Sequence, residues 1–245
     1  MFYVNKEKTE RIQTFANNAQ WFEDHMPYDA KYRKSDVKGI IANAIDVVIE
    51  TGDSGPVTPI GINLPNDQRI REQYGSKSVS LSNVREASDN ALPASMRTEF
   101  SWTPEEADRT LKFGALSAEL LTDMHEVIGH ASGQQAAGFK GTPQEAIKEH
   151  FSALEEGRAD LIGLYFIADP KLVELGIIPA ADHDAIVRAQ YEAYARNAIV
   201  QLRRVREGTQ IEEDHMRCSR RARPSEIRRS RRSYANSMYS RCSTK

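Results

Sequence analysis

The chain has 245 residues, which is long enough for one large domain or two small ones with a sizeable core. Its 40% hydrophobic and 28% charged residues are typical of a soluble globular protein, and no run approaches the roughly 18 apolar residues that a membrane span needs. The start, MFYVNKEKTE, lacks the apolar core of a signal peptide. Two cysteines, Cys218 and Cys242, cannot organise a fold through disulfides or a thiolate zinc site. We therefore expect a cytoplasmic protein without a membrane partner.

The net charge of −2 conceals two regions of opposite sign. From Cys218 to Lys245 there are eight arginines, one lysine and a single acidic residue, which gives about +8. Residues 1–217 carry 24 basic and 34 acidic residues, a net charge of −10. An acidic main body argues against a nucleic-acid-binding protein, so we expect no nucleic-acid partner.

In the first hundred residues the patterns predict two helices followed by extended segments. Apolar residues at helical spacing favour a helix over 6–24 and another over 35–50. TGDSGPVTP (51–59) is typical of a loop, and IGINLPNDQ (60–68) looks extended, broken by Pro65. For residues 76–84 we expect an ordered, non-helical connection, because Val79 and Leu81 alternate with serines while Val84 falls out of step.

The remainder reads as long helices. A threonine cap followed by proline and glutamate starts a helix at Thr103, which runs to about Ala131 with an interruption near Gly114. The same signal at Thr142 starts a second helix, to about Ala168. A third pattern covers 181–206, and a shorter helix begins near Gln210. The fold class we expect is mainly α, with little β structure.

Residues 218–245 need a separate interpretation. They contain seven serines, eight arginines and almost no aliphatic residue, so they cannot bury enough apolar surface to offset the entropy cost of ordering. A nucleic-acid-binding arm is one interpretation. The abrupt change of composition within a helical pattern favours the other, a disordered terminus or a displaced reading frame. We therefore expect a main domain over 1–217 and a separate basic tail over 218–245.

The stretch HEVIGH (125–130) is one residue longer than the HExxH of ordinary zinc peptidases. Histidines four apart on a regular helix project about 40° from one another, whereas His125 and His130, five apart, would diverge by about 140°. A π-bulge would bring both rings to one side, and Gly129 supplies backbone freedom for it. A metal site therefore predicts a wide turn here. Glu126 lies where a general base can reach a water on the metal.

A third ligand is needed, because catalytic zinc takes three protein ligands, commonly two histidines and one carboxylate. LEEGRADLIGLY (154–165) offers Glu155, Glu156 and Asp160 on the next capped helix. One glutamate can bind zinc, and the other acids can accept the outward ring N–H groups of the two histidines. Arg158 would balance the charge of these acids. Acidic pairs on helices are usually solvated, so the metal interpretation rests on the combination of the two stretches.

HEVIGH together with EEGRAD (155–160) resembles the HExxGH and EExRA(D/E) motifs of the dipeptidyl peptidase III family of zinc metallopeptidases. The resemblance extends over about 15–217 and includes GINLPN (61–66), SVSLSNV (78–84) and EDHM (213–216). It implies a zinc-dependent peptidase, with one zinc ion as cofactor, that releases N-terminal dipeptides from an oligopeptide substrate. It also implies a two-lobed fold, of which residues 1–217 correspond mainly to the helical, zinc-bearing catalytic lobe.

The resemblance also implies roles for individual residues. His125, His130 and Glu156 look like the zinc ligands, and Glu126 looks like the catalytic acid/base. Glu155 and Asp160 resemble residues that support the ligands from behind. Further matches concern the substrate and transition state: Asn63 and Asn66 correspond to asparagines that hydrogen-bond the peptide, and His215 to a histidine that stabilises the transition state. From the residues alone, turn-forming asparagines beside Pro65 and an exposed helical histidine are equally good interpretations of these three.

The chain departs from the family pattern at both ends. The residues with which the family captures the free N-terminus of a peptide lie on its other lobe, and this sequence has no counterpart before Asn63. The family also has an arginine four residues after the position of His215, where Ser219 stands here. We therefore expect a fragment, truncated at both ends or displaced in frame near residue 217.

Three functional hypotheses differ in what the purified chain would do. The first is zinc-dependent peptide hydrolysis with Glu126 as general base. The second is a zinc-binding but catalytically inactive fragment that binds peptides or a partner. The third is salt-sensitive nucleic-acid binding through residues 218–245. We favour the first for the chemistry of the site, and the sequence does not indicate an oligomeric state.

Overall fold

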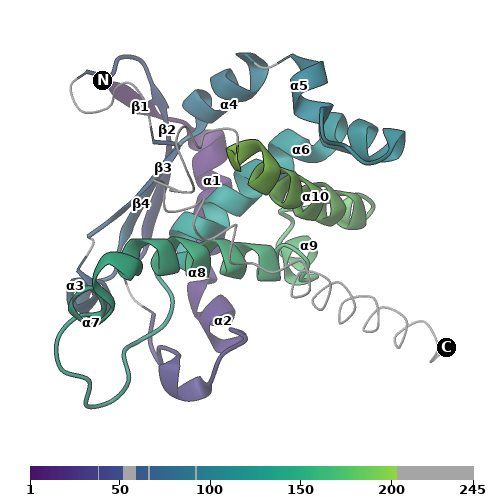
Figure 1. The fold of residues 1–245 in the computed structure, drawn as a ribbon. Helices are drawn as coiled ribbons and strands as arrows, with labels where there is room; N and C mark the ends of the chain where they lie inside the picture. Colours follow the sequence, from purple (N-terminus) through teal and green to yellow (C-terminus); the bar gives the residue numbers. More distant parts are fainter. Residues whose placement is uncertain (38, 52–58, 66, 92, 203–245) are drawn as a thin grey trace, which may run out of the picture.

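The computed structural model describes residues 1–37, 39–51, 59–65, 67–91 and 93–202. A small four-stranded sheet lies on one side, and helices pack against one of its faces (Figure 1). Most of the elements in this part of the chain are helices. The predicted class, mainly α with little β structure, is confirmed.

The first elements are strand β1 (Phe2–Val4) and helices α1 (Lys6–Asn17) and α2 (Ala19–Asp24). Asn5 caps α1, and its side-chain oxygen accepts the amide N–H of Lys8 at 3.1 Å. Ile12, Phe15 and Phe22 are fully buried, as their helical spacing predicts. The predicted helix over 6–24 is therefore present, divided at Asn18 into α1 and α2.

The helix predicted over 35–50 is wrong, because strand β2 (Ile41–Val47) occupies its centre. The apolar residues of this segment fit the two-residue repeat of a strand as well as the repeat of a helix, and tertiary contacts decide which of the two forms. The backbone of Ala44 both donates to and accepts from the hydroxyl of Thr9 on α1, at 3.0 and 3.2 Å. Ala42 and Ala44 are small enough for α1 to lie close to this face of the strand.

Two further strands and a short helix follow. β3 (Gly61–Leu64) confirms the extended segment that Pro65 ends. Helix α3 (Gln68–Tyr74) is capped by Asp67, and β4 (Lys77–Leu81) then leads into α4 (Ser82–Ala91). The non-helical connection predicted for 76–84 is correct only as far as Leu81. Val84 falls out of the alternating pattern because it already belongs to α4.

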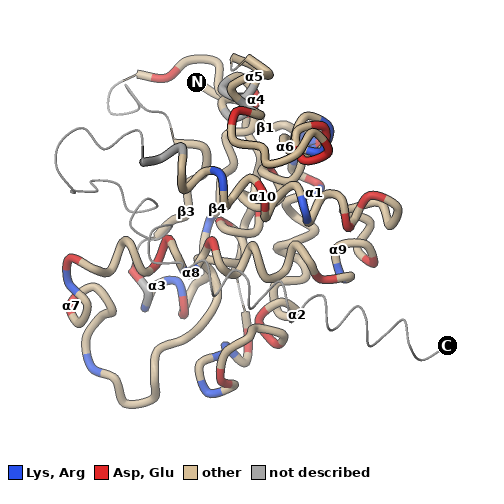
Figure 2. Tube along the Cα trace, turned by 45° about the vertical axis from the view of Figure 1, so that its right-hand side comes forward, with Lys and Arg blue, Asp and Glu red and all other residues tan. Residues whose placement is uncertain are grey.

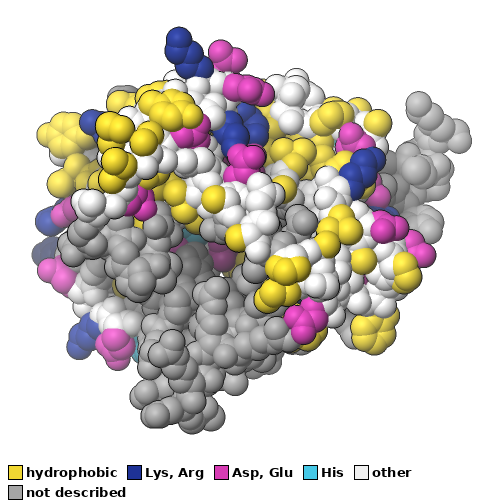
Figure 3. Space-filling model, turned by 90° about the horizontal axis from the view of Figure 1, so that it is seen from above, with side chains coloured by type: hydrophobic (Ala, Val, Ile, Leu, Met, Phe, Trp, Pro, Cys, Tyr) yellow, Lys and Arg dark blue, Asp and Glu magenta, His cyan; other side chains and the backbone are white. Residues whose placement is uncertain are grey.

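The strand order in the sheet is β1-β2-β4-β3. β2 and β4 run parallel, whereas β1 and β3 pair antiparallel with them at the two edges. In this register Asn63 lies beside Ser78, and Gly61 lies beside Ser80, all on the face that carries Ala42 and Ala44. The opposite face bears exposed apolar side chains: Phe2, Val4, Ile62 and Leu64. Figure 3 shows apolar side chains gathered on the left, the side on which the sheet lies in Figure 1.

Helix α5 (Ala94–Thr98) precedes the long helix α6 (Pro104–Met124). Helix α10 (His183–Leu202) packs against α6. The hydroxyl of Thr103 caps α6, as predicted, but no interruption occurs at Gly114. α6 and α10 are joined by the ion pair of Arg109 with Glu192 at 2.7 Å and by that of Arg196 with Glu106.

The helix predicted over 142–168 is divided. It consists of α7 (Pro143–Ile147), a 3-10 turn (Lys148–His150) and α8 (Phe151–Phe166), with α9 (Lys171–Glu174) after it. The reciprocal capping of Thr142 and Glu145 is present as predicted. Lys148 has a φ of 54°, a left-handed conformation that a continuous helix cannot contain.

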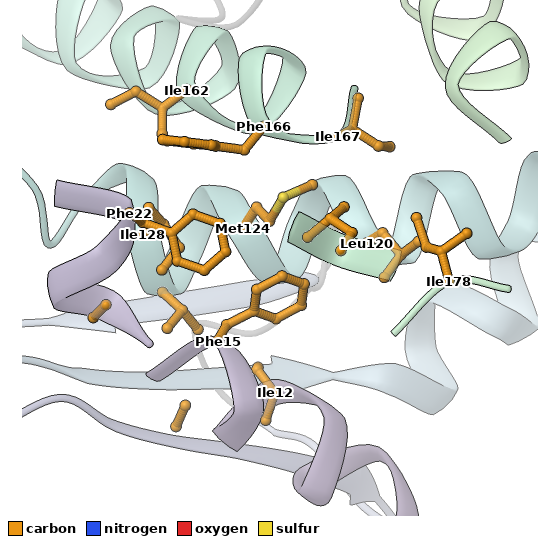
Figure 4. Packing of buried hydrophobic residues seen from close by; sticks show 14 of the residues in the cluster. Ile12, Phe15, Phe22, Leu120, Met124, Ile128, Ile162, Phe166, Ile167 and Ile178 are labelled. Carbon is orange, nitrogen blue, oxygen red and sulfur yellow. The ribbon is translucent and has the colours of Figure 1, made fainter. Parts of the chain in front are cut away.

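The core lies where α1, α2, α6 and α8 meet, as Figure 4 shows. Phe22 and Phe166 pack edge to face with ring centroids 4.9 Å apart, and Met124 and Leu120 of α6 are fully buried beside them. Charged residues of both signs are interspersed along the trace (Figure 2). Of the helices in the described ranges, none combines the length and apolar character required to cross a membrane.

Candidate metal centre

The HEVIGH stretch forms a π-turn (His125–Gly129) that continues α6. The amide N–H of His130 donates to the carbonyl of His125, five residues earlier, at 3.0 Å. This wider turn removes the divergence of about 140° that a regular helix would impose. The two imidazole rings consequently lie side by side, with centroids 4.6 Å apart and planes at 89°. The wide turn predicted from the spacing is confirmed.

Gly129 serves a different purpose from the one predicted. Its backbone does not adopt the left-handed conformation that favours glycine. A Cβ atom at this position would lie 2.8 Å from both the Cα and the Cβ of Ala159 on α8. Glycine is therefore required because the π-turn and α8 approach each other closely, which brings the histidines next to the acids of α8.

Glu156 of α8 lies opposite both histidine rings. Its Oε2 atom is 3.1 Å from Nε2 of His125 and 3.8 Å from Nε2 of His130. One ligand atom from each of the three residues lies within 4.8 Å of the others. Ligand atoms about 2.0–2.2 Å from a tetrahedral zinc ion are separated by about 3.3 Å, so the three residues fit such an ion with little rearrangement.

The other nitrogen of each ring contacts a second carboxylate. Nδ1 of His125 is 2.9 Å from Oδ1 of Asp160, and Nδ1 of His130 is 3.1 Å from Oε1 of Glu155. The hydroxyl of Tyr194, on α10, donates to Oδ2 of Asp160 at 3.0 Å. A carboxylate at Nδ1 holds the proton there and leaves Nε2 available as a ligand. The structure thus brings together the residues that the two motifs suggested.

These contacts set the protonation of the site when no metal is bound. Burial alone would lower the pKa of His125, but hydrogen bonds with Asp160 and Glu156 and the negative charges of Asp160 and Glu126 raise it to about 10. Burial likewise opposes the ionisation of Glu155, but His130 and Arg158 outweigh it and hold the pKa of this carboxyl well below its ordinary value. A metal ion bound by His125 and Glu156 would therefore displace the proton that lies between them.

Three cations hold the chain immediately after the π-turn. The guanidinium of Arg71 donates to the carbonyl of His130 at 3.1 Å, the ammonium of Lys34 to that of Ala131, and the guanidinium of Arg158 to that of Ser132 at 3.4 Å. Cations are favourable at the carbonyl end of a helix because the peptide dipoles place partial negative charge there. The cations come from three separate segments. Lys34 and Arg71 lie in no recognised metal-binding motif, so the sequence alone does not indicate their role.

A buried carboxylate completes this end of the turn. Glu23 of α2 is 1% exposed and accepts the amide N–H groups of Lys34 at 2.7 Å and Gly133 at 3.0 Å. Burial and the charge of Glu23 raise the pKa of the adjacent Tyr28 hydroxyl to about 12. The segment after His130 is thus fixed by charged groups on both its carbonyl and its amide side.

Glu126 is buried between the π-turn and the sheet. Its carbonyl accepts hydrogen bonds from Nδ2 of Asn63 at 3.0 Å and from the hydroxyl of Ser78 at 3.1 Å. The family resemblance assigns Asn63 to peptide binding, and the sequence indicates no role for Ser78. The other predicted substrate residue, Asn66, and the predicted transition-state residue, His215, lie outside the described residues.

Residues 2–140, which include HEVIGH, match the family model described as peptidase family M49. The chain belongs to this family. The resemblance to dipeptidyl peptidase III enzymes is also confirmed. "Dipeptidyl peptidase 3" of Nematostella vectensis is 32% identical over 131 residues, 54% of this chain and 17% of its own length. A further relative, "Nudix hydrolase 3" of Arabidopsis thaliana, is 30% identical over 158 residues, 64% of this chain and 20% of its own.

Solved structures of dipeptidyl peptidase III enzymes share the fold of this chain. Dipeptidyl-peptidase III from Corallococcus sp. strain EGB superposes with a TM-score of 0.72 at 23% identity, over 89% of this chain and 38% of that one. At this identity the likeness establishes the fold. This M49 chain spans about a fifth of the length of the two curated relatives.

Proposed function

We propose that this chain carries the zinc centre of a peptidase that releases N-terminal dipeptides from oligopeptides. The observation that carries the proposal is the arrangement of His125 and His130, whose Nε2 atoms converge on Glu156 while their Nδ1 atoms contact Asp160 and Glu155. Membership of peptidase family M49 supports the hydrolysis of peptide bonds. The names of the relatives support the release of dipeptides.

The donor set favours zinc over harder cations. Two imidazole nitrogens and one carboxylate form the usual catalytic zinc site, whereas magnesium and calcium prefer oxygen ligands alone. When bound, a zinc ion would act as a Lewis acid and lower the pKa of a water molecule in its fourth position. His125, His130 and Glu156 would hold it, and Asp160 and Glu155 would fix the two rings.

Glu126 is the group that we assign to proton transfer. It follows His125 directly and is buried beside the ligands, so its carboxylate can take a proton from the attacking water and return it to the leaving amine. By the motif resemblance, Asn63 and Asn66 hold the peptide and His215 stabilises the oxyanion. The amide nitrogen of Asn63 already donates to the Glu126 carbonyl and to Ser78, and its Oδ1 atom is buried without a hydrogen-bond partner among the described residues, so a peptide N–H could bind this oxygen only if the surrounding chain moved to expose it.

Metal analysis and two substitutions test this assignment. The purified chain should contain one zinc ion, and Glu156→Gln should remove it. Glu126→Gln should retain the metal but lower kcat for a chromogenic dipeptidyl amide by at least about 10²-fold, a typical contribution of general acid–base catalysis. A chain that binds no stoichiometric divalent metal, or a Glu126→Gln variant with full activity, would contradict the proposal.

The second hypothesis, a zinc-binding chain without turnover, is favoured by one observation. The chain spans about a fifth of the length of two curated relatives, so most of the length of those proteins has no aligned counterpart in it. One zinc ion without hydrolysis, together with binding of oligopeptides, would support this alternative. Activity gained by a longer chain that contains the same site would locate the deficit outside the metal centre.

A further inference from the structure

The carboxylate of Glu126 lies directly against the backbone of strand β3. A Cβ atom added to Gly61 would stand 2.3 Å from Oε1, 2.7 Å from Cδ and 2.8 Å from Cγ of Glu126. Real Cβ contacts are not this short, so any residue other than glycine must move the carboxylate or the strand. Gly61 has no left-handed φ and begins β3, so backbone conformation does not explain the glycine.

The same face of the sheet holds the other end of Glu126. The carbonyl of Glu126 accepts from Nδ2 of Asn63 on β3 and from the hydroxyl of Ser78 on β4, at 3.0 and 3.1 Å. Nδ2 of Asn63 also donates to the hydroxyl of Ser78 at 2.8 Å. Ser78 is fully buried, so these donors have little freedom to turn elsewhere.

Strand register explains why these residues act on one target. Asn63 and Ser78 are direct partners across β3 and β4, and Gly61 is two residues from Asn63, so all three face the π-turn. Both β3 and β4 contact the π-turn. The sheet therefore contacts Glu126 at two places. Asn63 and Ser78 donate hydrogen bonds to its backbone carbonyl, and the backbone of Gly61 lies against its carboxylate.

We propose that strands β3 and β4 form a platform that positions Glu126 for proton transfer, and that Gly61 determines where its carboxylate lies. The proposal rests on the catalytic role assigned to Glu126. Gly61, Asn63 and Ser78 are positioning residues in it, because they act through Glu126. Small displacements are costly at such a group, since proton transfer requires heavy atoms within about 2.6–3.2 Å.

A double-mutant cycle in the metal-free chain tests the contact itself. Gly61→Ala should lower the midpoint of thermal unfolding, because the buried Glu126 side chain must turn away from the new Cβ. In a Glu126→Ala background the three atoms closest to the new Cβ are gone, so the same substitution should cost less than half as much. Gly114→Ala, on α6, is the matched control, because its Cβ would meet only Thr110 at 3.6 Å. Equal costs of Gly61→Ala in both backgrounds would overturn the proposal.

The cobalt(II)-loaded chain provides a readout that packing alone would not move. Gly61→Ala should shift the visible absorption bands while metal affinity stays within threefold, and the shift should disappear in the Glu126→Ala background. Where hydrolysis is measurable, kcat should fall at least tenfold with KM within threefold. An unchanged spectrum and an unchanged kcat would show that Gly61 serves only packing.

Ser78→Ala keeps the proposal testable if Gly61→Ala does not fold. It removes one of the two donors to the Glu126 carbonyl and should shift the cobalt spectrum in the same way, whereas Ser80→Ala, a buried serine on the same face of β4, should not. Identical spectra for the two serine variants would overturn the platform. Failure of the chain to bind any divalent metal would reject the proposed function, while the metal-free cycle would still decide whether Gly61 positions Glu126.

Discussion

At the scale of single residues, each metal-facing histidine is held by a carboxylate of its own. Asp160 contacts His125, and Glu155 contacts His130, both through Nδ1. Glu155 is in turn held by two hydrogen bonds from Arg158, at 2.7 and 3.0 Å. Such outer contacts fix the tautomer and the ring orientation, and they typically contribute 10- to 100-fold to metal affinity.

Asp160→Asn should therefore weaken zinc binding by about 10- to 100-fold, because the amide replaces a charged acceptor at Nδ1 of His125. Competition with a chromogenic chelator measures the affinity. Asp184→Asn is the matched control, since Asp184 forms an exposed ion pair with Arg188 on α10 and should leave the affinity unchanged. A loss of the same size in both variants would show that the effect is not local.

A buried acid near the site predicts a pH dependence of stability. Asp123 is 1% exposed, and burial together with the charge of Glu119 raises its pKa from 3.8 to about 7, against the opposing effect of Arg11. Between these pH values the folded protein holds a proton that the unfolded chain has lost. Stability should therefore fall as pH rises from about 4 to 7, by up to about 4 kcal/mol from this group.

Asp123→Asn isolates this contribution, because asparagine does not titrate. Relative to the parent chain, the variant should become more stable as pH rises from 4 to 7, because only the parent chain loses the contribution of Asp123. Urea unfolding at several pH values measures it. A difference independent of pH would mean that Asp123 is ionised throughout this range in the folded chain.

The residues of the candidate site were predictable to the extent that motifs named them. Spacing and residue type in HEVIGH and EEGRAD indicated the two histidines, Glu126 and a group of three acids, and the family resemblance assigned Glu156 as the ligand and Glu155 and Asp160 as the outer carboxylates. Lys34, Arg71 and Ser78 were not predictable in this way. They act through backbone carbonyls, and a carbonyl can be reached by many residue types from any segment that the fold brings near.

At the scale of elements, the decisive contact is the crossing of the π-turn and α8 at Gly129 and Ala159. Gly129→Ala should lower the unfolding free energy by more than about 2 kcal/mol, because the new Cβ meets backbone and side chain at 2.8 Å. Gly114→Ala in the same long helix should instead stabilise by about 0.5–1 kcal/mol, since its Cβ has room. Chemical denaturation of both variants measures the contrast, and two gains of stability would refute the close crossing.

The cations after the π-turn carry a second prediction at this scale. Arg71→Met leaves the His130 carbonyl without its guanidinium donor, so the unfolding free energy should fall by about 1–3 kcal/mol and zinc affinity should fall with it. Arg69→Met, on the same helix but exposed, is the control. Calorimetry and chelator competition measure the two effects. A loss of stability with unchanged zinc affinity would show that Arg71 does not act on His130.

Element types were predicted well where a segment is long, as for α6 and α10. They were mispredicted where a short apolar run fits two periods. Residues 41–47 carry such a run, and the contact of β2 with Thr9 and its pairing with β1 and β4 decide for a strand. The break at Lys148 could not be predicted from its neighbours, because no glycine or proline marks it.

At the scale of the whole molecule, the π-turn is a junction for α1, α2, α8 and the sheet. A metal ion would add a link between the end of α6 and α8. At a free zinc concentration of about 100 times its Kd, the folded state should gain about 2.7 kcal/mol, which corresponds to roughly 5–11 °C in Tm. Calorimetry with and without zinc measures the gain, and Glu156→Gln should abolish it. An equal gain in the variant would place the ion elsewhere.

The π-turn also limits where the chain tolerates a change of length. One residue added to or removed from a regular helix rotates all that follows by about 100°. Removing a residue between His125 and His130 would restore an ordinary helix with histidines four apart. It would also turn position 129 away from Ala159 and turn the next carbonyls away from their cations. The number of residues from His125 to His130 thus sets the contacts of two helices and of three distant side chains. An insertion or deletion in this stretch would disrupt all of these contacts at once.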